Sequence, residues 1–193
     1  AKILGKNYTA EDYMDMAMAE FEKGNQDDGV KYFYKAAEMG NAVAMCNVGT
    51  FYLNGISFDR DPKKALEWYK KAAEAGHEFA MFQVGEFYSA QQNDTEAFQW
   101  YMKAAENDAE YAMTEVATMY LKGAGVAKNE DEGLKWLKKA AELNHAPAMS
   151  MLGRMYELGI VVEQDIHEAL KWYVEAANLG EEHAQERLKM LFD

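Results

Sequence analysis

Apolar residues recur at helical spacing along the chain, and they do so in pairs of segments. From Ala44 to Tyr52 the apolar positions lie mostly three or four residues apart, and the next such segment ends at the block Lys71–Glu74. Spacing of this kind is typical of amphipathic helices. Turn-forming residues such as Asn54 and Gly55 separate the two segments. The pattern therefore predicts a helical hairpin.

This hairpin is repeated along the chain. The block Lys-Ala-Ala-Glu begins at residues 35, 71, 103 and 139, and a related Glu-Ala-Ala-Asn begins at 175, so that the steps are 36, 32, 36 and 36 residues. A second block, Ala-Met with a tyrosine eight residues after the alanine, begins at residues 44, 80, 112 and 148. Self-similarity at this period indicates a stack of helical repeats.

Residue types that favour helix ends mark the second helix of every hairpin. Its start is marked by an asparagine or aspartate that suits an N-cap: Asn25, Asp61, Asn93, Asn129 and Asp165. Its end is followed by a residue that tolerates the left-handed backbone conformation: Gly40, Gly76, Asp108, Asn144 and Gly180. Both ends of five helices are thus predicted.

Three sets of equivalent residues are predicted to form the core. An aromatic column lies four residues before each alanine pair: Tyr32, Trp68, Trp100, Trp136 and Trp172. A column of small residues would keep helix crossings close: Gly49, Gly85, Ala117 and Gly153. We interpret a third column as adaptable packing rather than as soft metal ligands: Met45, Met81, Met113 and Met149.

The pattern Ala-Met-x-x-Val-Gly-x-Phe-Tyr, followed by Asp-x-x-x-Ala-Leu-x-Trp-Tyr-x-Lys-Ala-Ala-Glu-x-Gly, resembles the Sel1-like repeat, a relative of the tetratricopeptide repeat. The fold class expected from this resemblance is all-α, a right-handed α/α superhelix (solenoid) of tandem helical hairpins. We expect a single repeat domain over residues 1–193. Its parts would be a tetratricopeptide-like repeat at 9–40, repeats at 41–76, 77–108, 109–144 and 145–180, and a C-terminal capping helix at 181–193.

Charge narrows the range of partners. The chain has 33 acidic and 20 basic residues and a formal net charge of -13, which repels nucleic acid and anionic lipid headgroups. No stretch approaches the ~18 apolar residues of a membrane-spanning helix. We expect a monomer that binds another protein or peptide, without nucleic acid or membrane insertion. A cytoplasmic location is expected, with a periplasmic or secreted one open if a leader was removed.

Catalytic signatures do not occur in the sequence. It has no Gly-x-Ser-x-Gly, no phosphate-binding glycine loop and no His-Glu-x-x-His. The single cysteine, Cys46, can form neither an internal disulfide nor a four-ligand zinc site alone. We therefore predict a non-enzymatic protein without catalytic residues, metal or cofactor. A weak hydrolase, as proposed for some cysteine-rich members of the family that the chain resembles, is the alternative from another class.

The resemblance implies an adaptor or scaffold that binds other proteins. Positions that vary between repeats on the first helices are predicted to line a concave groove for a peptide or a partner helix. The convex face or the rim loops are the alternative contact surface. The predicted partner-binding residues are Asn47, Thr50, Phe82, Gln83, Glu86, Thr114, Glu115, Thr118, Ser150 and Arg154. An immunity or inhibitor protein, which neutralises a toxin or an enzyme through its acidic surface, is the alternative within the binding class.

Overall fold

A computed structural model describes residues 2–3 and 6–193. Eleven α-helices and one pair of two-residue strands follow one another in these residues. The chain divides into two compact units, unit 1 (Ala1–Gln91) and unit 2 (Gln92–Asp193). The all-α architecture of tandem hairpins that the sequence predicts is confirmed, with the short strand pair as an addition.

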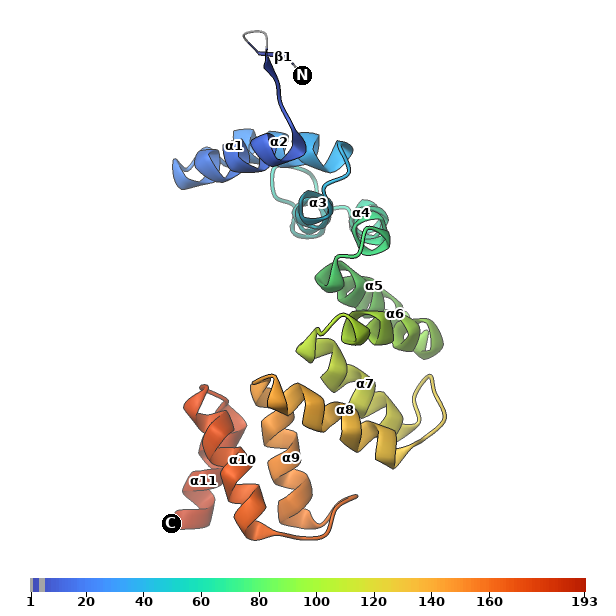
Figure 1. Cartoon of the computed structure of the whole chain (residues 1–193), viewed down its shortest axis with the longest axis vertical. Coiled ribbons are helices and arrows are strands. Elements are labelled where there is room, and N and C mark those ends of the chain that lie inside the picture. Colours follow the sequence, from blue (N-terminus) through green and yellow to red (C-terminus); the bar gives the residue numbers. More distant parts are fainter. Residues whose placement is uncertain (1, 4–5) are drawn as a thin grey trace. The chain divides into compact units, whose positions relative to one another are not determined.

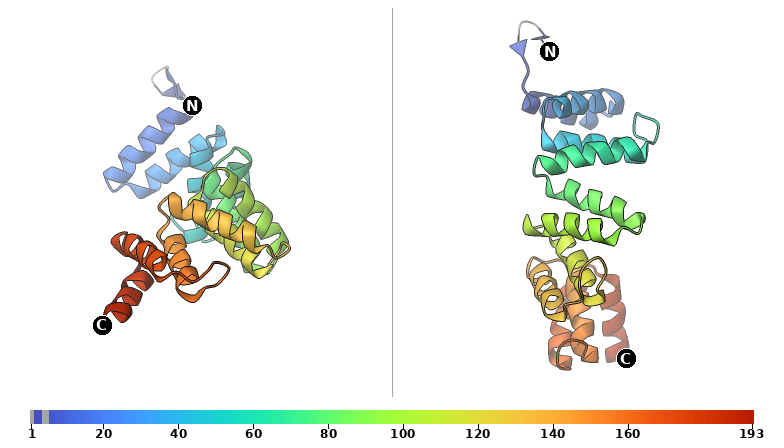
Figure 2. Two further views of the ribbon diagram at one scale, coloured as in Figure 1. Left: turned by 60° about the horizontal axis from the view of Figure 1, so that its bottom comes forward. Right: turned by 90° about the vertical axis from the view of Figure 1, so that its right-hand side faces the viewer.

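Unit 1 begins with strands β1 (Lys2–Ile3) and β2 (Lys6–Asn7), which pair antiparallel. Its helices are α1 (Ala10–Glu22), α2 (Gln26–Glu38), α3 (Ala42–Asn54), α4 (Pro62–Glu74) and α5 (Glu78–Ala90). Each helix packs against the next one along the chain, and α1 with α2 forms a hairpin, as does α3 with α4 (Figure 1). The loop that joins α3 to α4 projects from the end of its hairpin (Figure 2, right).

Unit 2 has the same plan. Its helices are α6 (Asp94–Glu106), α7 (Glu110–Lys122), α8 (Glu130–Glu142), α9 (Ala146–Leu158), α10 (Ile166–Asn178) and α11 (Glu182–Phe192). Each packs against the helix that follows it. The expected helix over 181–193 is α11, which packs on α10.

The helix ends lie where the capping residues predict them. Asp61, Asn93, Asn129 and Asp165 each accept a hydrogen bond from the backbone N–H three residues later. Asn25 also occupies the N-cap position, but its side-chain amide donates to Glu20 instead. Two residues after the end of each second helix the backbone is left-handed, with φ of 93° at Gly40, 93° at Gly76, 64° at Asp108, 65° at Asn144 and 86° at Gly180.

The predicted aromatic core column is wrong by one position. Tyr32, Trp68, Trp100, Trp136 and Trp172 are only partly buried. The buried side chains belong to the next residue in each second helix: Phe33, Tyr69, Tyr101, Leu137 and Tyr173. The physical reason is the direction of the apolar stripe, because Val30, Phe33 and Ala37 share one face at i, i+3 and i+7 and place Tyr32 at its edge. Several edge rings instead carry a lysine, such as Lys103 over Trp100 at 4.2 Å.

The small column serves the close helix crossing that was predicted. A Cβ atom on Gly49 would lie 2.9 Å from the ring of Tyr69, and one on Gly153 would lie 2.8 Å from the ring of Tyr173. Tyr69 and Tyr173 therefore rest directly on the backbone of α3 and α9. In the methionine column Met81, Met113 and Met149 are buried and Met45 is partly buried, which agrees with the packing interpretation.

Candidate protein-binding site

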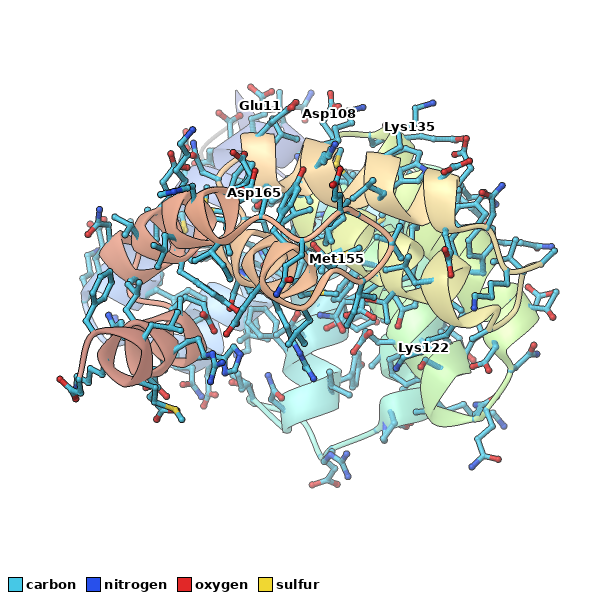
Figure 3. The ribbon with its side chains drawn as sticks, turned by 90° about the horizontal axis from the view of Figure 1, so that it is seen from below. Glu11, Asp108, Lys122, Lys135, Met155 and Asp165 are labelled. Atoms are coloured by element: carbon cyan, nitrogen blue, oxygen red, sulfur yellow. The ribbon has the colours of Figure 1, made fainter. Side chains whose placement is uncertain are left out.

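The predicted binding residues lie on first helices of both units. Asn47 and Thr50 are on α3 of unit 1, and Phe82, Gln83 and Glu86 are on α5. In unit 2 the predicted residues are Thr114, Glu115 and Thr118 on α7 and Ser150 and Arg154 on α9. Lys135 of α8 is exposed and points outward in Figure 3, whereas Met155 of α9 is buried among the helices.

On α3 the structure separates a packing residue from a surface residue. The hydroxyl group of Thr50 lies 2.8 Å from the hydroxyl of Tyr69 on α4 and donates to the carbonyl of Cys46 at 3.2 Å. Burial raises the pKa of Tyr69 to about 12, so this phenol stays protonated. Thr50 thus contributes to the packing of α3 against α4. Asn47, one turn earlier, is half-buried.

On α5 the predicted residues adjoin an aromatic surface. The rings of Phe79 and Phe82 stack with their centroids 6.5 Å apart, and Phe79 is 38% exposed. Gln83 is half-buried and Glu86 is exposed. The start of α5 therefore combines an accessible apolar ring with polar groups, a composition that suits a protein contact.

Two of the predicted residues in unit 2 are not accessible. Thr114 is 7% exposed and Ser150 is 4% exposed. Cys46, at the equivalent position of unit 1, is also 4% exposed. The Thr114 hydroxyl lies 2.8 Å from Nδ1 of His145, so it bridges two helices. This column points into the packing between helices, and Thr114 and Ser150 therefore leave the candidate set. Phe82 occupies the same column but is half-buried.

The other predicted residues of unit 2 reach the surface. Glu115 and Thr118 are half-buried on α7, and the Thr118 hydroxyl donates to the carbonyl of Thr114 at 3.0 Å. Arg154 is exposed on α9 and lines a hollow of about 330 Å³ together with Glu157, His183 and Arg187. This hollow places two arginines and one buried carboxylate on one side of unit 2.

Sequence reasoning missed the cluster around Glu157. This carboxylate is only 7% exposed, accepts from the Tyr173 hydroxyl at 2.7 Å and accepts from Nε of Arg187 at 2.8 Å. The hydrogen bond from Arg187 holds the pKa of Glu157 below its usual range, since it outweighs the opposing effect of burial. Arg187 thus joins α11 to α9. The signal was a glutamate at the position of Leu53 and Leu121.

The described residues offer little for covalent or metal chemistry. Burial, with a smaller effect from Glu78, raises the pKa of the Cys46 thiol to about 12, so at neutral pH it is not a nucleophilic thiolate. No group of three histidine, cysteine, aspartate or glutamate side chains in this part of the chain could hold a metal ion. None of the helices described is long and apolar enough to cross a membrane.

Comparisons with known proteins support the repeat assignment. The sequence model of the Sel1 repeat family matches residues 20–41, 42–77, 79–108, 110–145 and 146–181. A comparison with curated proteins gave no match. The chain is similar to the solved structure of a Sel1 repeat protein from Oxalobacter formigenes, with 27% identity, a TM-score of 0.88 and coverage of 95% of this chain and 78% of that one.

Two further solved structures are similar over nearly the whole chain. One is a protective antigen of uropathogenic Escherichia coli with an SLR fold, at 30% identity and a TM-score of 0.83; the match covers 95% of this chain and 41% of that protein. The other is an immunity protein from Pseudomonas aeruginosa, at 27% identity and a TM-score of 0.60, with coverage of 91% and 67%.

Proposed function

The chain belongs to the Sel1 repeat family, and we propose that it is a non-catalytic scaffold that binds a peptide or a helix of another protein through the variable, solvent-accessible positions of its first helices. The observation that supports this most directly is the contrast between neighbouring columns. Ala44, Ala80, Ala112 and Ala148 are identical and fully buried. Three residues later the column reads Asn47, Gln83, Glu115 and Met151, and all four are half-buried.

The contrast has a physical meaning. Identical packing between helices needs identical side chains only where helices touch, so a column that changes at every repeat is not dictated by the fold. A second column, with Thr50, Glu86, Thr118 and Arg154, varies less, since it has threonine in two repeats and Thr50 contacts Tyr69 of α4. Its charged members are the exposed ones, Glu86 in unit 1 and Arg154 in unit 2. Side chains that vary, reach the surface and differ in charge can select a partner.

Substitutions on α5 test the proposal. We expect Phe82→Ala to weaken partner binding by about 2 kcal/mol, because a partly buried aromatic ring is a typical interface hot spot. The measurement is affinity capture from the native source, followed by titration of the captured partner against wild type and variant. The melting temperature is measured in parallel, since Phe82 also contacts its own chain.

A second pair of variants keeps the test decisive if Phe82→Ala destabilises the protein. Glu86→Ala changes an exposed side chain on α5, and Glu67→Ala changes an equally exposed glutamate on the second helix α4. We expect only Glu86→Ala to lower the affinity. Equal binding by wild type, Phe82→Ala and Glu86→Ala would place the contact elsewhere.

A second candidate function is that of an immunity protein. It is supported by the similarity to immunity proteins from Pseudomonas aeruginosa, at 25–27% identity, and by the formal charge of -13. An acidic surface would accelerate association with a basic toxin. The test is to mix the purified chain with any secreted effector encoded beside its gene. A stoichiometric complex that abolishes toxicity would favour this candidate over a general scaffold.

A further inference from the structure

Unit 1 contains a hollow of about 620 Å³ on the side of the second helices. It lies between α2 and the loop that follows α3. Its lining residues are Asp27, Val30, Lys31, Tyr34, Lys35, Glu38, Tyr52, Ser57 and Phe58. None of these residues belongs to the set predicted from the sequence.

Aromatic rings form a continuous wall of this hollow. Phe58 of the loop stacks on Tyr52 with the centroids 4.4 Å apart and the ring planes 14° apart. The ring of Tyr34 meets Phe58 edge-on at 6.1 Å and meets Trp68 of α4 edge-on at 5.4 Å. Aromatic faces attract cations and planar groups.

The residues that line this hollow differ from those at equivalent positions of unit 2. At the equivalent positions of unit 2, Phe98 replaces Val30 and Val126 replaces Phe58, and Phe98 packs edge-on against Tyr120 at 5.2 Å. In unit 1 the aromatic partner of the tyrosine comes from the loop instead. The loop is also held differently, because Ser57 hydrogen-bonds to Asp27. In unit 1 the hollow therefore lies between the small side chain of Val30 on α2 and a loop that the Ser57–Asp27 hydrogen bond holds in place.

The charges around the hollow favour a cationic occupant. The lysines of the lining are directed to other groups, since Lys31 lies 4.0 Å from Asp28 and Lys35 lies over the ring of Tyr13 at 5.4 Å. Outside the lining, Lys64 of α4 lies over the ring of Tyr52 at 5.5 Å. Glu38, at the C-terminal end of α2, makes no ion pair with any residue that the structure describes. The chain as a whole is acidic, with a formal charge of -13.

We propose that this hollow receives an arginine side chain from the partner protein, with the guanidinium group against the rings of Tyr34 and Phe58 and paired with the carboxylate of Glu38. The inference rests on the proposed protein-binding function but adds a contact away from the first helices. Arginine fits better than lysine, because its planar group stacks on aromatic faces and presents a fork of donors to a carboxylate.

The test uses synthetic peptides and NMR. The probe is a glycine-serine peptide with one central arginine, and the comparison peptides carry citrulline, lysine or leucine at that position. The reporter is the indole N–H of Trp68, which adjoins Tyr34, and Trp100 of unit 2 is the internal control. We expect the arginine peptide to shift Trp68 but not Trp100, and to bind at least tenfold more tightly than the citrulline peptide.

Variants of the protein complete the test. The double variant Val30→Phe with Phe58→Val reproduces the residues of unit 2 at nearly constant volume, and we expect it to fold and to lose the Trp68 response. Glu38→Gln should weaken binding about fivefold, because it removes a charged partner of the guanidinium. Glu106→Gln, at the equivalent position of unit 2, should change nothing.

Several outcomes would overturn the inference. Binding of the leucine peptide as tightly as the arginine peptide would show that the hollow takes apolar side chains. An unchanged response in the double variant would place the arginine elsewhere. Failure of all the peptides, while Glu86→Ala still weakens the captured partner, would remove this site and leave the proposed function intact. Loss of both effects would remove both.

Discussion

Units 1 and 2 repeat one backbone plan with different side-chain solutions at equivalent positions. Beside the tyrosine that ends the first helix, unit 1 has a small residue on the preceding helix and an aromatic on the loop, Val30 and Phe58. Beside Tyr120 unit 2 has the reverse, Phe98 and Val126, whereas beside Tyr156 it has Leu134 and Val162. The ring stacks flat on Tyr52 in unit 1 and edge-on against Tyr120 in unit 2. The summed volume of these two side chains is the same, and only its distribution between helix and loop differs.

The loop that follows the first helix also differs between the two units in one side chain. Ser57 of unit 1 and Gly125 of unit 2 are equivalent, and both have left-handed backbone, with φ of 59° and 71°. A Cβ atom on Gly125 would lie 2.2 Å from the carbonyl oxygen of Asp94, so this loop rests on the first turn of α6. The repeat therefore specifies the backbone of the loop, while one side chain sets how closely it approaches the preceding helix.

The histidines that precede α5 and α9 occupy equivalent positions but make different hydrogen bonds. Nδ1 of His77 accepts a hydrogen bond from the backbone N–H of Ala80 at 3.3 Å and so caps α5. The equivalent His145 has Nδ1 2.8 Å from the hydroxyl of Thr114 and does not cap α9. A helix start tolerates either arrangement when each buried polar group finds a partner. Differences between units can thus accumulate without loss of the fold.

Exchange of the loop residues should have the largest effect on stability. Gly125→Ala places a Cβ against a backbone carbonyl and puts a non-glycine residue at positive φ. We expect a loss of about 3 kcal/mol in the free energy of unfolding. Urea unfolding followed by circular dichroism measures it.

The control is the opposite exchange in unit 1. Ser57→Gly removes the hydrogen bond to Asp27 but relieves the positive φ of a serine, so we expect a change within about 0.5 kcal/mol. Equal losses in the two variants would mean that the loops approach their helices in the same way.

Exchanging the large and the small residue beside Tyr120 should have an intermediate effect on stability. Phe98→Val removes a partly buried ring, and we expect a loss of about 1.5 kcal/mol. Adding Val126→Phe supplies an aromatic from the loop, as in unit 1, and should recover at least half of that loss. The measurement is thermal unfolding of the two single variants and the double variant. A double variant less stable than both single variants would show that the two positions do not share one space.

The histidine difference should have the smallest effect. Burial lowers the pKa of His145, although Glu110 opposes the shift. The unfolded chain therefore binds a proton more readily, and this contribution to stability is present above the unfolded pKa and is lost as the pH falls through it toward the lower folded pKa. Acidification from pH 7.5 to 5.5 should thus destabilise wild type more than His145→Gln, as measured by melting temperature. A titration midpoint for His145 above its unfolded value in NMR would contradict this.

Local chemistry made the helix ends predictable. Asp61 or Gly76 determines the start or end of a helix through its own hydrogen bonds and backbone preference, which do not depend on the neighbouring helices. The core was less predictable. Trp68 and Tyr69 are adjacent and both aromatic, and only the direction of packing decides that Tyr69 is buried. The same uncertainty placed Thr114 and Ser150 on the surface, although the structure buries both.

The candidate binding surfaces also differ in how far the sequence predicts them. The sequence determined the repeat, the hairpins and the two variable columns of the first helices, because these follow from spacing within one helix or one turn. Only the tertiary structure showed the joining of Glu157 to Arg187 and the hollow beside Tyr34, since each depends on side chains that are brought together by packing between helices. The partners of Glu157 are 16 and 30 residues away in sequence. Contacts over such distances depend on how helices cross, which periodicity alone does not specify.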